Sequence, residues 1–222
     1  MTAERMTAGE RSKRSKFGIV LLLLVLVFIF VVPAFPISVH KVMYNALLTG
    51  IVLFAALSVD RARRRMLVVS GAAIALEWLA FLLDMPGVMI FSQIVLFLYF
   101  ILIVINLIAQ VATTSHVTAR VIVDSISGYL LMGIVFSLII RIVAKNSDSA
   151  YSFGEATHVS KGLSDFVYHG FVTFTTLGYG DVVPLTPISK SIAVMASVTG
   201  QIYLTVIIAM LVGKFLSNRQ VS

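Results

Sequence analysis

Long apolar runs alternate with short polar breaks along this chain. A helix needs about 20 residues to cross a hydrocarbon core roughly 30 Å thick. The breaks carry turn or charge signals, such as the prolines at 33 and 36 and the arginines within 60–65. The runs between the breaks predict six spanning helices, at 17–32, 39–59, 66–83, 87–109, 121–144 and 188–216. We therefore expect an all-α integral membrane fold.

The composition supports this prediction. Of the 222 residues, 59% are hydrophobic and 12% are charged, and the mean hydropathy is +1.02. These values exclude an ordinary soluble domain. The chain has no cysteine, so neither disulfides nor thiolate metal sites are possible.

The basic residues predict the orientation of the helices, because lysine and arginine concentrate in cytoplasmic segments. A cytoplasmic N-terminus puts most of them inside, namely Arg5, Arg11, Lys13, Arg14, Lys16, Arg61, Arg63, Arg64, Arg65, Arg120, Lys214 and Arg219. It leaves outside Lys41, Arg141, Lys145, Lys161 and Lys190. We expect a multi-pass protein of the plasma membrane with both termini in the cytoplasm. The net charge of +7 is then explained by helix ends facing anionic headgroups, without a nucleic acid partner.

A cleaved signal peptide is the competing interpretation of the N-terminus, since a basic start precedes an apolar run. The sequence Pro33-Ala34-Phe35-Pro36 is a poor cleavage site, so we expect 1–16 to be a cytoplasmic tail instead.

The segment Thr175-Thr176-Leu177-Gly178-Tyr179-Gly180-Asp181 is the part of the chain that indicates chemistry. Two glycines that flank one residue allow the backbone to alternate between ordinary and positive φ, so that successive carbonyls face one side. A row of carbonyls with a threonine hydroxyl at its inner end can replace the water around a cation. A phosphate-binding loop is disfavoured, because it would need a preceding strand and a Gly-Lys-Ser/Thr ending.

The segment resembles the selectivity filter of potassium channels, with Leu177 where many members have valine. The resemblance covers 121–216 and implies K⁺ sites formed by the carbonyls of Thr176, Leu177, Gly178 and Tyr179 and by the Thr176 hydroxyl, with Gly180 completing the filter. It implies support from Thr175, Tyr179 and Asp181, with Tyr168, His169 and Val172 at the places that hold bracing residues in the family. It also implies a homotetramer, K⁺ ions in place of any other cofactor, and no enzymatic activity.

The residues around the filter predict its setting. Residues 163–175 form a short amphipathic run, which predicts a re-entrant pore helix that Ser164 caps and whose positive end Asp165 suits. In the last helix, Ser197, Gln201 and Thr205 recur every four residues and so lie on one stripe. We expect the stripe to line a wet cavity; the alternative is hydrogen bonding to a neighbouring helix. Gly200 matches the inner-helix glycine of the family, and close helix packing is its alternative role.

These features divide the chain into a four-helix unit at 17–110, a pore domain at 119–217 and a tail at 218–222. The fourth helix carries no arginine, so we expect no conventional voltage sensor. Glu77 is an intramembrane carboxylate and a possible sensor; a buried hydrogen bond is the alternative. The arginines 61 and 63–65 either determine topology or bind anionic lipid.

We therefore predict a potassium-selective channel subunit that conducts K⁺ passively. The alternatives are a potassium-uptake transporter, a poorly selective cation channel and a non-conducting or modulatory membrane protein. The transporter is disfavoured because the filter motif occurs once and the chain shows no internal repeat. His40, His116, His158 and His169 lack a metal-ligand spacing, although His169 lies close enough to the filter to make conduction sensitive to pH.

Overall fold

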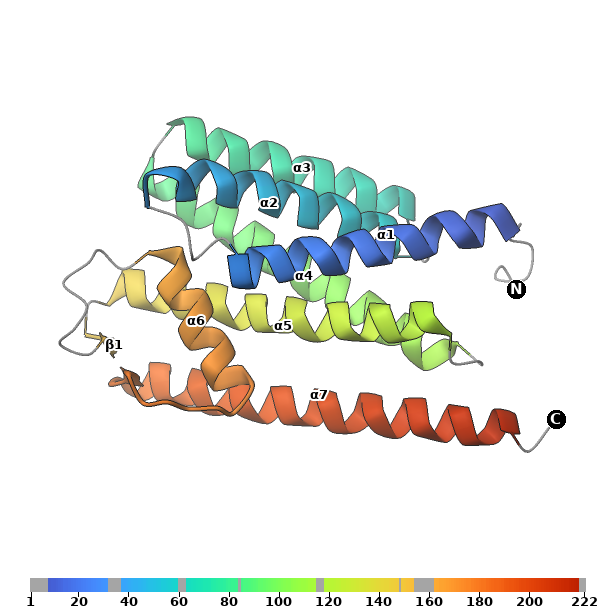
Figure 1. Ribbon diagram of the computed structural model, residues 1–222. Helices are drawn as coiled ribbons and strands as arrows, with labels where there is room; N and C mark the ends of the chain where they lie inside the picture. The colour runs from blue at the N-terminus through green and yellow to red at the C-terminus, as the bar shows by residue number, and fades with distance from the viewer. Residues whose placement is uncertain are drawn as a thin grey trace.

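The computed structural model describes residues 8–31, 37–59, 63–83, 85–114, 118–147, 149–153 and 162–219. Within these ranges the chain is almost entirely helical (Figure 1). In chain order the elements are α1 (Ala8–Leu26), η1 (Val27–Val31), α2 (Ile37–Ser58), α3 (Arg63–Leu83), α4 (Pro86–Thr113), α5 (Ala119–Asn146), β1 (Tyr151–Phe153), α6 (Leu163–Phe174), β2 (Val182–Pro184) and α7 (Pro187–Arg219).

Four helices of the described residues are long and apolar enough to cross a membrane. They are Arg63–Leu83, Gly87–Thr113, Ala119–Asn146 and Pro187–Lys214. The apolar parts of the first two helices, Lys16–Val31 and Val42–Ser58, are shorter. These helices support a multi-pass membrane protein, and the count of six crossings stays a prediction.

The long helices run roughly side by side, and α6 crosses the space between α5 and α7 at a slant (Figure 1). Helix α1 begins and helix α7 ends at the same end of the molecule (Figure 1). The expectation that both termini lie in the cytoplasm stays a prediction.

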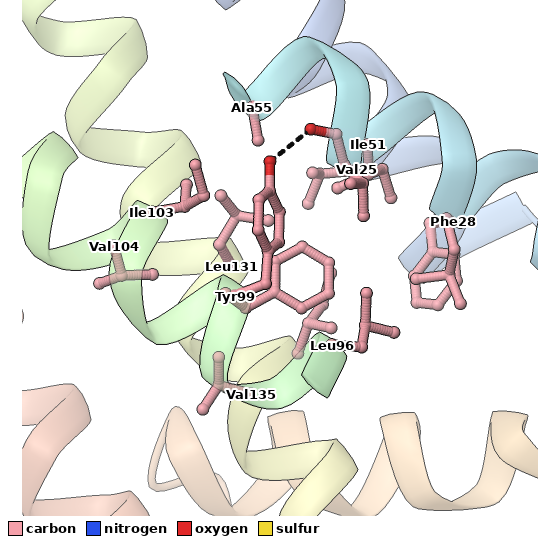
Figure 2. Close-up of a cluster of buried hydrophobic side chains, with 14 of the residues drawn as sticks. Val25, Phe28, Ile51, Ala55, Leu96, Tyr99, Ile103, Val104, Leu131 and Val135 are labelled. Carbon is pink, nitrogen blue, oxygen red and sulfur yellow. Dashed lines mark hydrogen bonds between the residues drawn. The ribbon is translucent and has the colours of Figure 1, made fainter. Parts of the chain in front are cut away.

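A continuous hydrophobic core joins the first four helices to α5 and α6. It contains Phe28 from η1, Ile51 from α2, Tyr99 from α4 and Leu131 from α5 (Figure 2). The buried Tyr99 hydroxyl donates to the backbone carbonyl of Val52 at 2.6 Å, so the one polar atom of this large side chain is satisfied. The predicted division into 17–110 and 119–217 stays a prediction, and the two parts share this core.

Helix α5 packs against α1, α4, α6 and α7. Small residues permit the close contact with α6. A Cβ at Gly133 would lie 2.5 Å from the Phe171 ring, and a Cβ at Gly170 would collide with Ser137. These positions therefore fix the distance between α5 and α6.

A two-stranded antiparallel sheet lies beside residues 175–181, which we call the filter segment because they resemble the filter of potassium channels. The all-helical prediction did not include this sheet. Strand β1 pairs with β2 so that Ser152 is opposite Val183, and the Leu185 amide extends the pairing by donating to the Ala150 carbonyl at 2.9 Å. The sheet ties the segment after α5 to the segment after the filter. Strands of three residues are too short for an alternating pattern to be recognised in the sequence.

Candidate functional site

The filter segment has an alternating backbone. Thr176, Gly178 and Gly180 have φ values of 62°, 60° and 79°, whereas Leu177 and Tyr179, between them, do not have positive φ. The two glycines adopt this conformation without steric cost, whereas Thr176 does so against the preference of a β-branched residue. The alternation thus begins at Thr176, two residues before the first glycine, which the sequence did not indicate.

The carboxyl end of α6 holds the inner half of this segment. The Thr176 amide donates to the Thr173 carbonyl at 3.0 Å, and the Gly178 amide donates to the Val172 carbonyl at 3.1 Å. The Thr175 hydroxyl donates to the Phe171 carbonyl at 2.7 Å. Carbonyls that would be unpaired at the end of a helix therefore become the anchor of the filter segment.

The amino end of α6 is capped differently from the prediction. The helix begins at Leu163, so Ser164 lies inside its first turn and is not the cap. Gly162 precedes the helix, and its amide donates to the Asp165 carboxylate at 2.8 Å. The expectation for Asp165 at the positive end is thus met by a direct hydrogen bond.

The outer end of the filter segment is braced by one side-chain pair. The Tyr168 hydroxyl donates to Asp181 Oδ2 at 2.6 Å, and Asp181 Oδ1 accepts from the Val182 amide at 3.0 Å. The Tyr168 hydroxyl holds the pKa of the Asp181 carboxyl below its ordinary value of 3.8. Val172, in contrast, contributes its backbone carbonyl, and its side chain is buried.

Helix α7 contacts the end of α6 and the base of the filter segment through two of the three predicted polar residues. The Ser197 hydroxyl donates to the Thr173 carbonyl at 3.0 Å, and Gln201 Nε2 donates to Thr176 Oγ1 at 3.2 Å. The Thr205 hydroxyl instead donates to the Gln201 carbonyl of its own helix at 2.8 Å. Gln201 and Thr205 are nevertheless exposed in the single chain. The stripe therefore combines contact with a neighbouring segment and access to solvent.

Gly200 lies directly against the end of α6. A Cβ at this position would collide with the backbone carbonyl oxygen of Phe174, whose ring is itself fully buried. Close packing accounts for the glycine here, and its role as a point of bending stays a prediction.

His169 on α6 is buried and packs against Tyr151 of β1. Its ring meets that of Tyr151 edge-on at 5.4 Å between centroids. The atoms His169 Nε2 and Tyr151 Oη are buried and have no hydrogen-bond partner among the described residues.

Glu77 has an electrostatic partner that the sequence did not identify. It interacts with the guanidinium of Arg141 on α5, which also interacts with Tyr44 on α2. Glu77 Oε2 is buried and makes no hydrogen bond within the described residues. A role of Glu77 as a sensor stays a prediction.

The predicted lipid-binding arginines are described in part. Arg64 and Arg65 are exposed, and the Arg63 guanidinium lies 5.8 Å from the centre of the Phe17 ring. Arg61 lies outside the described residues.

A polar junction near the ends of α4 and α7 was missed by the sequence analysis. Lys214 Nζ donates to the carbonyls of Val111 and Ala112 at 2.7 and 3.0 Å. Nearby in the fold, the buried Asp124 accepts from Gln110 Nε2 at 2.8 Å and pairs with Arg120 at 3.4 Å. A carboxylate within the apolar run 121–144 was the available signal, since such residues require partners.

Comparison with known proteins points to the same part of the chain. A family described as ion channel matches residues 126–217, which contain most of α5 and all of α6, the filter segment and α7 up to residue 217. A voltage-gated potassium channel of Aeropyrum pernix is 48% identical over 48 residues, which are 22% of this chain and 16% of that protein. No solved structure matches the chain. These findings, with the apolar helices, support an ion channel in a multi-pass membrane protein.

Proposed function

We propose that this chain is one subunit of a potassium-selective channel that conducts K⁺ passively. The observation that carries the proposal is the alternating φ of Thr176, Gly178 and Gly180 at the carboxyl end of α6. Such a backbone is suited to a row of carbonyl oxygens on one side of an extended strand. The similarity of a short segment to a protein named a potassium channel supports the choice of ion.

The ion ligands in this proposal are backbone groups. The carbonyls of Thr176, Leu177, Gly178 and Tyr179 and the Thr176 hydroxyl replace the water around K⁺. Ions then move between adjacent sites by mutual repulsion, so that binding is favourable but exit remains possible. The negative end of the α6 dipole favours a cation beneath the filter.

One strand provides ligands from one side, so the working unit requires several copies. Residues 175–181 are all exposed in the single chain, although the resemblance assigns them to the centre of a pore. Large apolar side chains on α7, including Val194, Val198 and Ile202, are exposed as well. We propose a cyclic homotetramer in which four filter segments face one axis.

The proposed channel has no conventional voltage sensor, although the relative in Aeropyrum pernix is named voltage-gated. Moving one charge through the membrane field yields about 2.3 kcal/mol per 100 mV, and steep voltage dependence needs several such charges. Helix α4 contains neither arginine nor lysine. We place the channel in the plasma membrane with both termini in the cytoplasm, on the strength of the lysine and arginine distribution.

Reconstitution of the purified protein in a planar bilayer tests this function. With K⁺ and Na⁺ on opposite sides, we expect a reversal potential near the K⁺ equilibrium value. The variant Gly178→Ala is expected to lose this selectivity, because alanine disfavours a φ of 60°. Gly213→Ala is a matched control, since a Cβ there meets no atom within 4 Å. A reversal potential near zero in the unmodified protein would indicate a poorly selective channel, and absence of K⁺ flux would favour a non-conducting membrane protein.

A further inference from the structure

The inner end of the filter segment is strained at Thr176. Its φ of 62° makes it the one non-glycine residue with positive φ among the described residues. A branched side chain makes this conformation unfavourable, so it persists only where neighbouring groups hold it. The contacts of Thr176 therefore identify the residues that maintain this end of the filter.

Two hydrogen bonds from different elements hold Thr176. Its amide donates to the Thr173 carbonyl of α6 at 3.0 Å. Its hydroxyl oxygen accepts from Gln201 Nε2 of α7 at 3.2 Å. The second hydrogen bond is donated by the side chain of Gln201, so a substitution of Gln201 can remove it without altering the backbone.

The surrounding contacts keep Gln201 in place. One turn earlier on α7, the Ser197 hydroxyl donates to the Thr173 carbonyl at 3.0 Å. The adjacent Gly200 packs against the Phe174 carbonyl. Gln201 thus projects from a stretch of α7 that is already fixed to the end of α6, and its reach to Thr176 is set by that packing.

The hydrogen bond also has a chemical consequence for the hydroxyl. A threonine hydroxyl has two lone pairs and one proton. Donation from Gln201 occupies one lone pair and restricts rotation of the side chain, which leaves the second lone pair available to a cation. We propose that Gln201 is a positioning residue for the innermost K⁺ site and determines how tightly that site holds K⁺. This inference rests on the proposed function.

The K⁺ dependence of thermal unfolding of the full-length protein in detergent tests this inference. A cation that binds the native state stabilises it by RT ln(1 + [K⁺]/Kd), so the unfolding midpoint rises with the logarithm of the K⁺ concentration once that concentration exceeds Kd. Titration with KCl at constant ionic strength, balanced with NaCl, gives the K⁺ concentration at which this rise begins, which is the apparent Kd. We expect Gln201→Met, which retains length but loses the donor, to raise that concentration about three- to tenfold, as loss of one neutral hydrogen bond implies.

Further variants test the route through Thr176. In a Thr176→Ala background, Gln201→Met is expected to cause no additional change, because the acceptor is already absent. Gln201→Asn retains an amide on a shorter side chain, and it is the variant to use if Gln201→Met does not fold. We expect Gln201→Asn also to raise the K⁺ concentration needed for stabilisation. Ser191→Ala, at an exposed position on the same helix, is the control.

The possible outcomes separate this inference from the proposed function. An unchanged K⁺ dependence in Gln201→Met or Gln201→Asn would overturn the role of Gln201 while leaving the channel intact. An equal effect of Gln201→Met on the K⁺ dependence in the unmodified and Thr176→Ala backgrounds would also overturn the role of Gln201. If K⁺ and Na⁺ stabilise the unmodified protein equally, the K⁺ filter itself is refuted and the role of Gln201 falls with it.

Discussion

The hydroxyl of Tyr168 lies 2.6 Å from the carboxylate of Asp181 and donates a hydrogen bond to it across the outer end of the filter segment. The two residues belong to different elements, since Tyr168 is part of α6 and Asp181 precedes β2. This hydrogen bond connects a side chain of α6 to the outer end of the filter segment. We therefore expect its removal to loosen that end of the segment.

Tyr168→Phe is expected to reduce K⁺ selectivity and to make the current decline several-fold faster during a sustained recording. The substitution removes the donor while it retains the ring, so Asp181 loses a charge-assisted hydrogen bond. Single-channel recording in opposed K⁺ and Na⁺ gradients measures both quantities. Asp181→Asn, which keeps an acceptor, should have a smaller effect. Equal currents in Tyr168→Phe and the unmodified protein would show that the pair does not brace the filter.

The pair also predicts a response to external pH. The donated hydrogen bond lowers the pKa of the Asp181 carboxyl below 3.8. A carboxyl with a lowered pKa contributes its stabilisation above its ordinary pKa, and that contribution is lost as pH falls through the lowered value. Selectivity should therefore be constant from about pH 8 to 5 and fall only below about pH 4. Reversal potentials recorded over this range provide the check, and a loss between pH 7 and 5 would point to His169 instead.

Gly200→Ala should destabilise the protein by about 1–3 kcal/mol, the usual cost of overpacking. The added methyl group collides with the Phe174 carbonyl, which cannot move without displacing the end of α6. Chemical denaturation in detergent measures the free energy of unfolding. Gly213→Ala on the same helix is the matched control, because a Cβ there meets nothing within 4 Å. Equal stabilities of the two variants would contradict the close contact.

Lys214→Met should lower the free energy of unfolding by about 1 kcal/mol and change the open probability of the channel. The ammonium group donates to the carbonyls of Val111 and Ala112 at the end of α4, where the helix dipole is negative. Lys214→Arg should retain most of this contribution. Denaturation and single-channel recording together distinguish a structural contact from one that also influences gating. Behaviour of Lys214→Met identical to the unmodified protein in both measurements would show that the contact has no consequence.

The positive φ of Gly178 and Gly180 was predictable because glycine adopts that conformation without steric cost, whereas the positive φ of Thr176 was not. The order of the helices was predictable from apolar runs, which report length directly. The partners of particular side chains were not. Tyr168 and Asp181 are 13 positions apart in the sequence. Their contact depends on the position of α6 relative to the filter segment. The cap at Gly162 was missed because a serine follows two residues later and is the more usual capping residue.

The contacts of Lys214 and Glu77 show a second limit. Hydropathy places a charged residue near a membrane boundary or within a helix, but it does not say which neighbouring helix the charge meets. Arg141, the electrostatic partner of Glu77, lies on α5 and was interpreted from the sequence only as one of the external basic residues. Such pairs arise from the packing of helices far apart in the chain.

The position of Asp124 limits whether the proposed pore domain can be moved to another protein without its first four helices. Its carboxylate is buried and accepts a hydrogen bond from Gln110, which belongs to α4. If α1 to α4 were removed, the leucine and isoleucine side chains of α5 would contact lipid. Lipid is as apolar as the helices that it would replace. Asp124 would lose Gln110 and face the membrane boundary with less to satisfy its charge. Joining the proposed pore domain to a different four-helix unit would therefore require a replacement for the Gln110 amide, because Asp124 ties α5 of this chain to its own α4.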